Sequence, residues 1–177
     1  MKILARLAVT LAVLIIGTFA IVLMWAHYKV QPLPTGVRAD KIVVDKSQRR
    51  LVLLQQGKPL KVYQIALGPT PVGHKECEGD GRTPEGLYRI DFRKLNSTFH
   101  RALHVSYPNA HDIQVAKSRG VNPGGAIMIH GLGKSLGWYD NLHHFVDWTA
   151  GCIAVTNSEI EELWRAVPDG CPVEIRP

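Results

Sequence analysis

The sequence lacks the features of several protein classes. It has no run of lysine and arginine and no stripe of aromatic side chains, so we expect no nucleic-acid partner. It has no H-E-x-x-H motif, and the adjacent His143 and His144 would point apart on a strand, so we expect neither a metal site nor another cofactor. Internal repeats and low-complexity segments are also missing, and 177 residues suit one globular domain.

Cysteine is scarce, since Cys77, Cys152 and Cys171 are the three examples in the chain. In an oxidising compartment an odd number leaves at least one thiol without a partner inside the chain, and such a thiol is a candidate for chemistry. A disulfide between Cys77 and Cys171 and a pair of inert thiols at these positions are both open.

Charged residues are absent from the N-terminal run 7–26, which is long enough to cross a bilayer as a helix. Lys2 and Arg6 precede this run, so the positive-inside rule predicts a cytoplasmic N-terminus. No convincing A-x-A cleavage pattern follows, which favours an uncleaved signal anchor over a cleaved signal peptide. We therefore expect a single-pass protein of the inner membrane, with residues 1–28 as the transmembrane segment and the working domain in the periplasm.

The rest of the chain divides into a short spacer and one domain. Residues 29–39 contain prolines and a glycine and predict a stiff linker, and residues 40–177 form the domain. Short runs rich in valine, isoleucine, leucine and tyrosine recur along the domain and predict a mainly β fold. The expected strands are 41–44, 51–56, 60–67, 86–92, 102–106, 126–130, 152–155 and 173–176.

The domain shows fewer sequence signals for helices than for strands. Thr156 to Glu159 has the pattern of a capping box, and the helix that follows is expected to end near Pro168. The long polar segments 68–84 and 107–125 predict loops, and long loops on a compact sheet protein commonly carry function.

Cys152 lies at the start of a predicted strand, directly after Gly151. A nucleophilic thiol needs surrounding donors that lower its pKa, and it needs space for a substrate carbonyl, which the preceding glycine provides. The backbone N–H groups of Gly151 and Cys152 would stabilise the oxyanion that forms on attack. A small buried cysteine in a strand fits the same spacing.

His130 ends the predicted strand 126–130 and is followed by Gly131. A histidine at this place suits a general base, because its pKa lies close to ambient pH. A purely structural histidine at the end of a strand fits the pattern equally well.

Two motifs taken together carry a resemblance to a known family. Ile127-Met128-Ile129-His130-Gly131 and the later Thr149-Ala150-Gly151-Cys152-Ile153 resemble the paired signature of the L,D-transpeptidase (YkuD-like) catalytic domain, in particular its small Gram-negative, membrane-anchored members. Segments 63–68, 73–75, 79–86 and 106–109 also look like that domain, so the resemblance covers roughly residues 40–177. It implies a β-sandwich-like fold with one or two short helices.

The resemblance also implies cysteine-dependent acyl transfer on peptidoglycan stem peptides at diaminopimelate, in cell wall remodelling and the control of cell shape. Cys152 would be the nucleophile, His130 the general acid and base, and Gly151 a backbone donor to the oxyanion. Thr149 matches the position of a residue that orients the histidine. Candidates for binding the substrate are His74, Lys75, Arg82, Gly131 and Arg119.

Two residues depart from the family pattern. Ala150 stands where many relatives have histidine, and Ala154 stands where many have an arginine suited to clamp a substrate carboxylate. The acceptor therefore stays open, and a hydrolase that uses the same site to cleave diaminopimelate-linked bonds is an alternative. A non-catalytic peptidoglycan-binding module is a second alternative, and the oligomeric state is not predicted.

Overall fold

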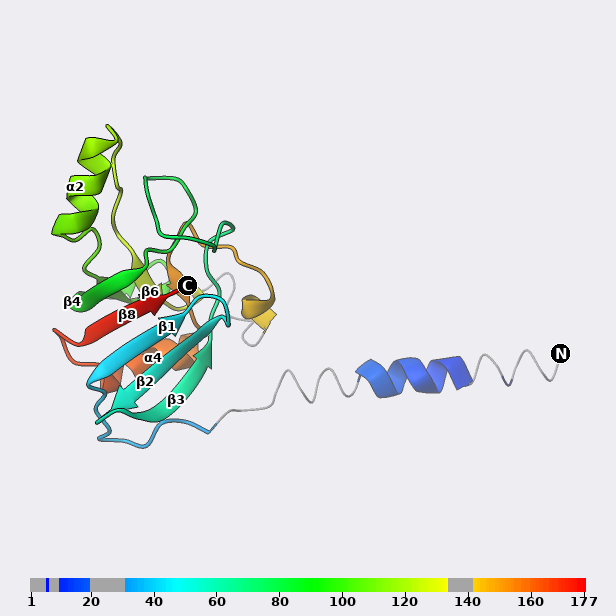
Figure 1. Cartoon of the computed structure of the whole chain (residues 1–177). Coiled ribbons are helices and arrows are strands. Elements are labelled where there is room, and N and C mark those ends of the chain that lie inside the picture. The colour runs from blue at the N-terminus through cyan, green and yellow to red at the C-terminus, as the bar shows by residue number, and fades with distance from the viewer. Residues whose placement is uncertain (1–5, 7–9, 20–30, 134–141) are drawn as a thin grey trace. The chain divides into compact units, whose positions relative to one another are not determined.

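The computed structural model describes residues 6, 10–19, 31–133 and 142–177, and the chain divides into two compact units, Met1–Gln31 and Pro32–Pro177 (Figure 1). In the first unit, residues 10–19 are helical. Among the described residues no helix is both long and apolar enough to cross a bilayer. Residues 1–5, 7–9 and 20–28 of the predicted transmembrane segment lie outside the described part of the chain.

Eight strands form the frame of the second unit (Figure 1). They are β1 (Lys41–Asp45), β2 (Arg50–Gln55), β3 (Lys58–Gln64), β4 (Gly86–Ser97), β5 (His100–Val105), β6 (Met128–His130), β7 (Ile153–Ala154) and β8 (Pro172–Arg176). They make one sheet in the order β3-β2-β1-β8-β4-β5-β6-β7, in which β1 with β8 and β6 with β7 are the parallel pairs. The prediction of a mainly β fold is confirmed, and each predicted strand corresponds to an observed one.

β4 joins the two halves of the sheet, because it is long enough to pair with different neighbours along its length. Residues 86–89 pair with β8, and residues 90–97 pair with β5 through two register shifts. At the far corner, Ala66, two residues after β3, forms a bridge with Ala154 in β7. The two outer strands are thereby linked, and the sheet curls on itself.

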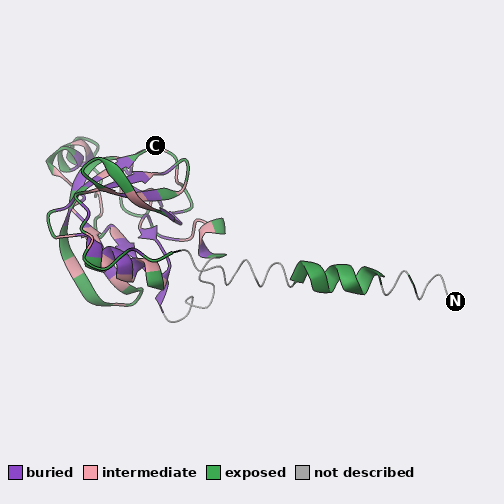
Figure 2. Ribbon diagram, turned by 90° about the horizontal axis from the view of Figure 1, so that it is seen from below, coloured by how far each residue is buried: buried purple, intermediate pink, exposed green. Residues whose placement is uncertain are grey.

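The hydrophobic core lies on the concave side of this sheet. Side chains alternate along the strands, so that Ile42 in β1 and Leu51 in β2 are fully buried. α4 (Asn157–Ala166) packs on β5 and β6 and adds the buried Ile160 and Leu163. Figure 2 shows the buried residues gathered between this helix and the strands, with exposed residues on the outside.

Two α-helices belong to this unit within the described residues. α4 begins after Thr156, which exchanges side-chain and backbone hydrogen bonds with Glu159, so the predicted capping box is confirmed. α2 (Ala110–Ser118) lies in segment 107–125, where the sequence predicts a loop. Its buried residues are Asp112 and Ala116, so the apolar periodicity that reveals a helix is missing.

The segment that the sequence predicts as a spacer packs against the domain in its described part. Leu33 is buried, and its N–H donates to Oε1 of Glu162 in α4 at 3.3 Å. Composition sets the local stiffness of such a segment, but it does not tell whether an apolar side chain between two prolines reaches the core. Residues 32–39 are therefore part of the fold.

The three cysteines are free thiols, so the predicted alternative of a disulfide between Cys77 and Cys171 is not formed. Cys171 belongs to the hydrophobic core just before β8, and burial raises the pKa of its thiol to about 11. Such a thiol stays protonated and unreactive at neutral pH.

Candidate active site

Parallel pairing of β6 and β7 brings His130 and Cys152 to one face of the sheet. Ile129 lies opposite Ile153, and His130 lies opposite Ala154. Because side chains alternate between the two faces, Ile129 and Ile153 enter the core, where both are fully buried. His130 and Cys152, the residue before Ile153, therefore emerge together on the opposite face.

The imidazole of His130 is held in one orientation. Its Nδ1–H donates to the carbonyl oxygen of Gly131 at 2.6 Å, which leaves Nε2 of the neutral ring as an acceptor. The ring stacks on Phe99 with 4.5 Å between centroids and meets the edge of Trp148 at 5.8 Å. Burial, assisted by the charge of His143, lowers the pKa of His130 against the opposing effect of the Gly131 carbonyl. A neutral imidazole is thus the resting form at neutral pH.

Cys152 sits among backbone groups of the chain that leads into β6. The N–H of Met128 points at Sγ at 3.4 Å, and the thiol donates to the carbonyl oxygen of Ala126 at 3.5 Å. Burial raises the pKa of Cys152, and the Met128 N–H and the charge of Lys75 offset part of that rise. The resting pair is therefore a thiol and a neutral imidazole, and a base must remove the thiol proton during attack.

Both groups open onto one cavity of about 230 Å³. It is lined by Lys94, Ser97, Thr98, Phe99, Ala102, Ala126, Met128, His130 and Cys152. The β4–β5 hairpin supplies one wall, and the segment 126–130 with Cys152 supplies the other. The hollow gives an acyl group access to the sulfur next to the imidazole.

The turn before Cys152 is fixed from several sides. Thr149 donates from Oγ1 to the carbonyl oxygen of Cys152 at 2.7 Å and accepts from the N–H of Gly151 at 3.2 Å. Gly151 has φ +109°, and a Cβ there would lie 2.5 Å from the carbonyl oxygen of Arg82, so a side chain is excluded. Thr83, fully buried, donates from its hydroxyl to the carbonyl oxygen of Gly151 at 2.9 Å.

A family model described as the L,D-transpeptidase catalytic domain (YkuD) matches residues 39–175. The chain belongs to this family. Over 132 residues it is 30% identical to the Escherichia coli (strain K12) protein named "Putative L,D-transpeptidase YafK", which covers 71% of this chain and 46% of that protein. The chain thus spans about half the length of the curated relatives it matches.

Solved structures share the fold of this L,D-transpeptidase-family chain. The helical cell shape determining protein Pgp2 from Campylobacter jejuni is 24% identical and gives a TM-score of 0.57 over 81% of this chain and 49% of that one. Bd1075 from Bdellovibrio bacteriovorus is 22% identical, with a TM-score of 0.52 over 84% of this chain and 54% of that one. At these identities the likeness concerns architecture, and it supports the fold that the resemblance implied.

Three residues assigned to the site by resemblance, Thr149, Gly151 and Gly131, make other contacts in this L,D-transpeptidase-family domain. Thr149 braces the turn before Cys152, and the group that orients His130 is the carbonyl of Gly131. The N–H of Gly151, expected to meet the oxyanion, is bound to Thr149. Gly131 is needed for close packing, since a Cβ there would lie 2.6 Å from Oδ1 of Asn157. A sequence motif locates these residues along the chain, but it does not predict their hydrogen-bond partners, which depend on the path of the folded backbone.

The substrate-binding candidates of the glycine-rich loop are engaged with carboxylates and do not line the Cys152 cavity. The ammonium of Lys75 lies 2.8 Å from Asp80, the guanidinium of Arg82 lies 3.6 Å from Glu76, and Nε2 of His74 lies 3.4 Å from Asp112. Arg119 also pairs with Glu76, at 3.1 Å. These pairs connect parts of the loop to one another and to α2.

Sequence reasoning did not identify the hairpin residues of the site. Phe99 covers the ring of His130, and Lys94 lines the cavity from β4. Both lie in a polar stretch after the predicted strand 86–92, with no motif of their own. The sequence carries little signal for the extension of β4, because Leu95 is the one apolar residue between Phe92 and Phe99 and shows no strand alternation.

Proposed function

We propose that this domain is a cysteine acyltransferase of peptidoglycan stem peptides, with Cys152 as nucleophile and His130 as general acid and base. The observation that carries the proposal is the cavity shared by the thiol and by an imidazole whose free nitrogen is Nε2. Membership of the L,D-transpeptidase family supports action on peptidoglycan. The bond that we propose as substrate joins a diaminopimelate residue to a D-amino acid.

The first half-reaction forms a thioester. Nε2 of His130 takes the proton of the Cys152 thiol as the sulfur attacks the carbonyl carbon of the L,D peptide bond. The backbone N–H of Cys152 is the donor proposed for the oxyanion, because that of Gly151 is engaged by Thr149. The carbon–nitrogen bond then breaks, and the imidazolium gives its proton to the departing amine.

The second half-reaction returns the enzyme. An acceptor amine attacks the thioester and gives its proton to Nε2, the sulfur leaves as thiolate, and the imidazolium restores the thiol. Water in place of the amine yields a free carboxylate instead of a new peptide bond. Transfer is the reaction proposed here, and hydrolysis is an outcome that the experiment distinguishes.

The proposed location is the periplasmic face of the inner membrane, with the chain anchored through residues 1–28. Lys2 and Arg6 before the apolar run 7–26 support this orientation. Protease treatment of spheroplasts tests it, because a periplasmic domain is digested without lysis. A domain that is cut only after lysis would contradict it.

The activity test uses the purified 177-residue chain and defined tetrapeptide muropeptides containing diaminopimelate, with and without an acceptor peptide. The products are identified by mass spectrometry for the wild type, for Cys152→Ala and for Cys77→Ala, a control that removes a thiol outside the cavity. We expect cross-linked product from the wild type and from Cys77→Ala, and none from Cys152→Ala.

The products of this assay distinguish a transferase from a hydrolase and from a binding module. Loss of the terminal D-amino acid without cross-linking, dependent on Cys152, would replace transfer by hydrolysis. Absence of product from the wild type, or equal product from Cys152→Ala, would reject the acyltransferase and favour a binding module.

A further inference from the structure

Among the described residues, one lysine or arginine side chain lines the Cys152 cavity. It is Lys94, near the end of β4, and within the part of the chain that the structure describes no carboxylate pairs with it. The cations of the glycine-rich loop differ, since Lys75 is bound to Asp80 and Arg82 to Glu76. An ammonium that lines this cavity and has no carboxylate partner is available for an anion of the substrate.

Sheet register places Lys94 in line with the catalytic pair. Lys94 lies opposite Ala102 in β5, and Ala102 lies opposite His130 in β6. Residues that face each other on neighbouring strands project from the same side of a sheet, so Lys94 and His130 share a face with only the methyl group of Ala102 between them. A long side chain at position 94 can therefore extend over Ala102 toward the reacting atoms.

The β4–β5 hairpin, which carries Lys94, is held in place by contacts with α4. Arg93, the preceding residue, donates from Nη1 to the carbonyl oxygen of Trp164 in α4 at 2.8 Å, and His100 and Arg101 both contact Glu161 at 2.7 Å. Because neighbouring side chains of a strand point to opposite faces, anchoring Arg93 on α4 directs Lys94 to the cavity.

Two residues with hydroxyl groups share this cavity with Lys94. Ser97 and Thr98 line the same cavity. The oxygen of Ser97 accepts from the N–H of Phe99 at 3.1 Å, which leaves its hydroxyl hydrogen to donate. A charged ammonium with hydroxyl donors nearby suits a carboxylate.

We propose that Lys94, with Ser97 and Thr98, forms a subsite that binds a substrate carboxylate next to the carbonyl attacked by Cys152. The assignment rests on the proposed acyl transfer. Two carboxylates of a stem peptide have this chemistry: the terminal carboxylate of the leaving D-amino acid and the side-chain carboxylate of diaminopimelate. Lys94 thereby determines which peptides are substrates, without taking part in proton transfer.

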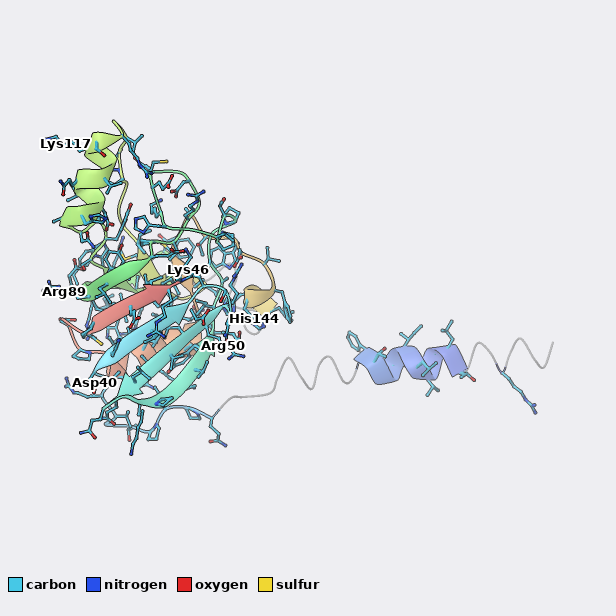
Figure 3. The ribbon with its side chains drawn as sticks, viewed as in Figure 1. Asp40, Lys46, Arg50, Arg89, Lys117 and His144 are labelled. Carbon is cyan, nitrogen blue, oxygen red and sulfur yellow. The ribbon has the colours of Figure 1, made fainter. Side chains whose placement is uncertain are left out.

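The first test does not require peptidoglycan turnover. Cys152 in the full chain is alkylated with iodoacetate, an anion, and with iodoacetamide, its neutral analogue, and the peptide containing Cys152 is quantified by mass spectrometry. We expect Lys94→Gln to lower the ratio of the iodoacetate rate to the iodoacetamide rate about threefold to tenfold. Lys94→Arg should keep the ratio. Lys117→Gln should keep it too, because it removes an exposed charge in the last turn of α2 (Figure 3) that does not line the cavity.

The second test identifies the carboxylate. The kcat/KM is measured for a tetrapeptide muropeptide, for its terminal D-alanine amide and for the amide of the diaminopimelate side chain. We expect Lys94→Gln to lower kcat/KM for the free acid about tenfold, mainly through KM, and to have no effect on the one amide that lacks the bound carboxylate. The amide whose kcat/KM is unchanged by Lys94→Gln identifies the carboxylate that Lys94 binds.

The outcomes separate the two proposals. An unchanged alkylation ratio in Lys94→Gln, or an equal loss of kcat/KM for all three peptides, overturns the subsite while leaving the acyltransferase intact. A shifted ratio with no turnover by the wild type supports the carboxylate subsite and rejects the proposed reaction.

Discussion

At the scale of single residues, the site is built by backbone groups as much as by side chains. The carbonyl of Gly131 selects the tautomer of His130, and the N–H of Met128 and carbonyl of Ala126 meet the sulfur of Cys152. Burial then keeps both titrating groups neutral, because a charge is poorly solvated there. The reactive pair is thus poised for proton transfer during attack, unlike a preformed thiolate–imidazolium pair.

The neutral pair predicts a particular pH dependence. The raised pKa of Cys152 means that the thiolate is scarce at neutral pH, so the rate of iodoacetamide alkylation at Cys152 should keep rising as the pH is increased above neutrality. The lowered pKa of His130 means that turnover should persist to below about pH 6.5 before the imidazole is protonated. A fast alkylation rate that is flat from pH 5 to 8 would indicate an ion pair instead.

Thr149 supports a second prediction. Thr149→Val keeps the shape of the side chain but removes the hydroxyl that bonds to the carbonyl oxygen of Cys152 and the N–H of Gly151. We expect the free energy of unfolding to fall by about 1–3 kcal/mol, since Thr149 is buried and its partners lose a hydrogen bond. Thr149→Ser, which keeps the hydroxyl, should lose much less in urea denaturation, and equal losses would argue against these hydrogen bonds.

At the scale of elements, the turn between β1 and β2 holds two loops in place around the nucleophile. Lys46, at the end of β1 (Figure 3), is almost fully buried and donates to the carbonyl oxygens of Gly73 and Thr83 and to Glu85. On the other side of the turn, Arg49 pairs with Asp147 at 2.7 Å. The glycine-rich loop and the turn before Cys152 are therefore tied to the same corner of the sheet.

Removing the buried ammonium of Lys46 should lower the free energy of unfolding. Lys46→Met leaves Glu85 and two carbonyl groups without their donor, and we expect a loss of about 3 kcal/mol in the free energy of unfolding. Lys41→Met on the same strand is the matched control, because its ion pair with Glu174 is partly exposed and should contribute at most about 1 kcal/mol. Similar denaturation midpoints for the two variants would show that the Lys46 contacts are not important for stability.

At the scale of the whole molecule, residues 32–177 form a compact unit whose sheet curls until its outer strands meet. The segment before β1 takes part in it, since Leu33 is buried, its N–H donates to Glu162, and the N–H of Ala39 donates to the carbonyl oxygen of Ala166 at 2.8 Å. Closing the sheet also protects its edges from pairing with other chains.

Two truncations test where the domain begins. A chain starting at Pro32 should keep the denaturation midpoint of the full chain, because the described contacts of the domain are retained. A chain starting at Asp40 loses the burial of Leu33 and two backbone hydrogen bonds, so we expect its free energy of unfolding to be lower by about 3 kcal/mol. Equal stability of both chains would mean that residues 32–39 act only as a spacer.

The sequence by itself determined the strands, the capping box at Thr156 and Glu159, and the family to which the pair His130 and Cys152 belongs. These features are local: apolar alternation, cap chemistry and short motifs act over a few neighbouring residues. The tertiary structure decided that Lys94 lies in line with His130, because that depends on the register of three strands. It also decided that the carbonyl of Gly131 holds the imidazole, because every residue carries a carbonyl and only the folded path of the chain determines what each one meets.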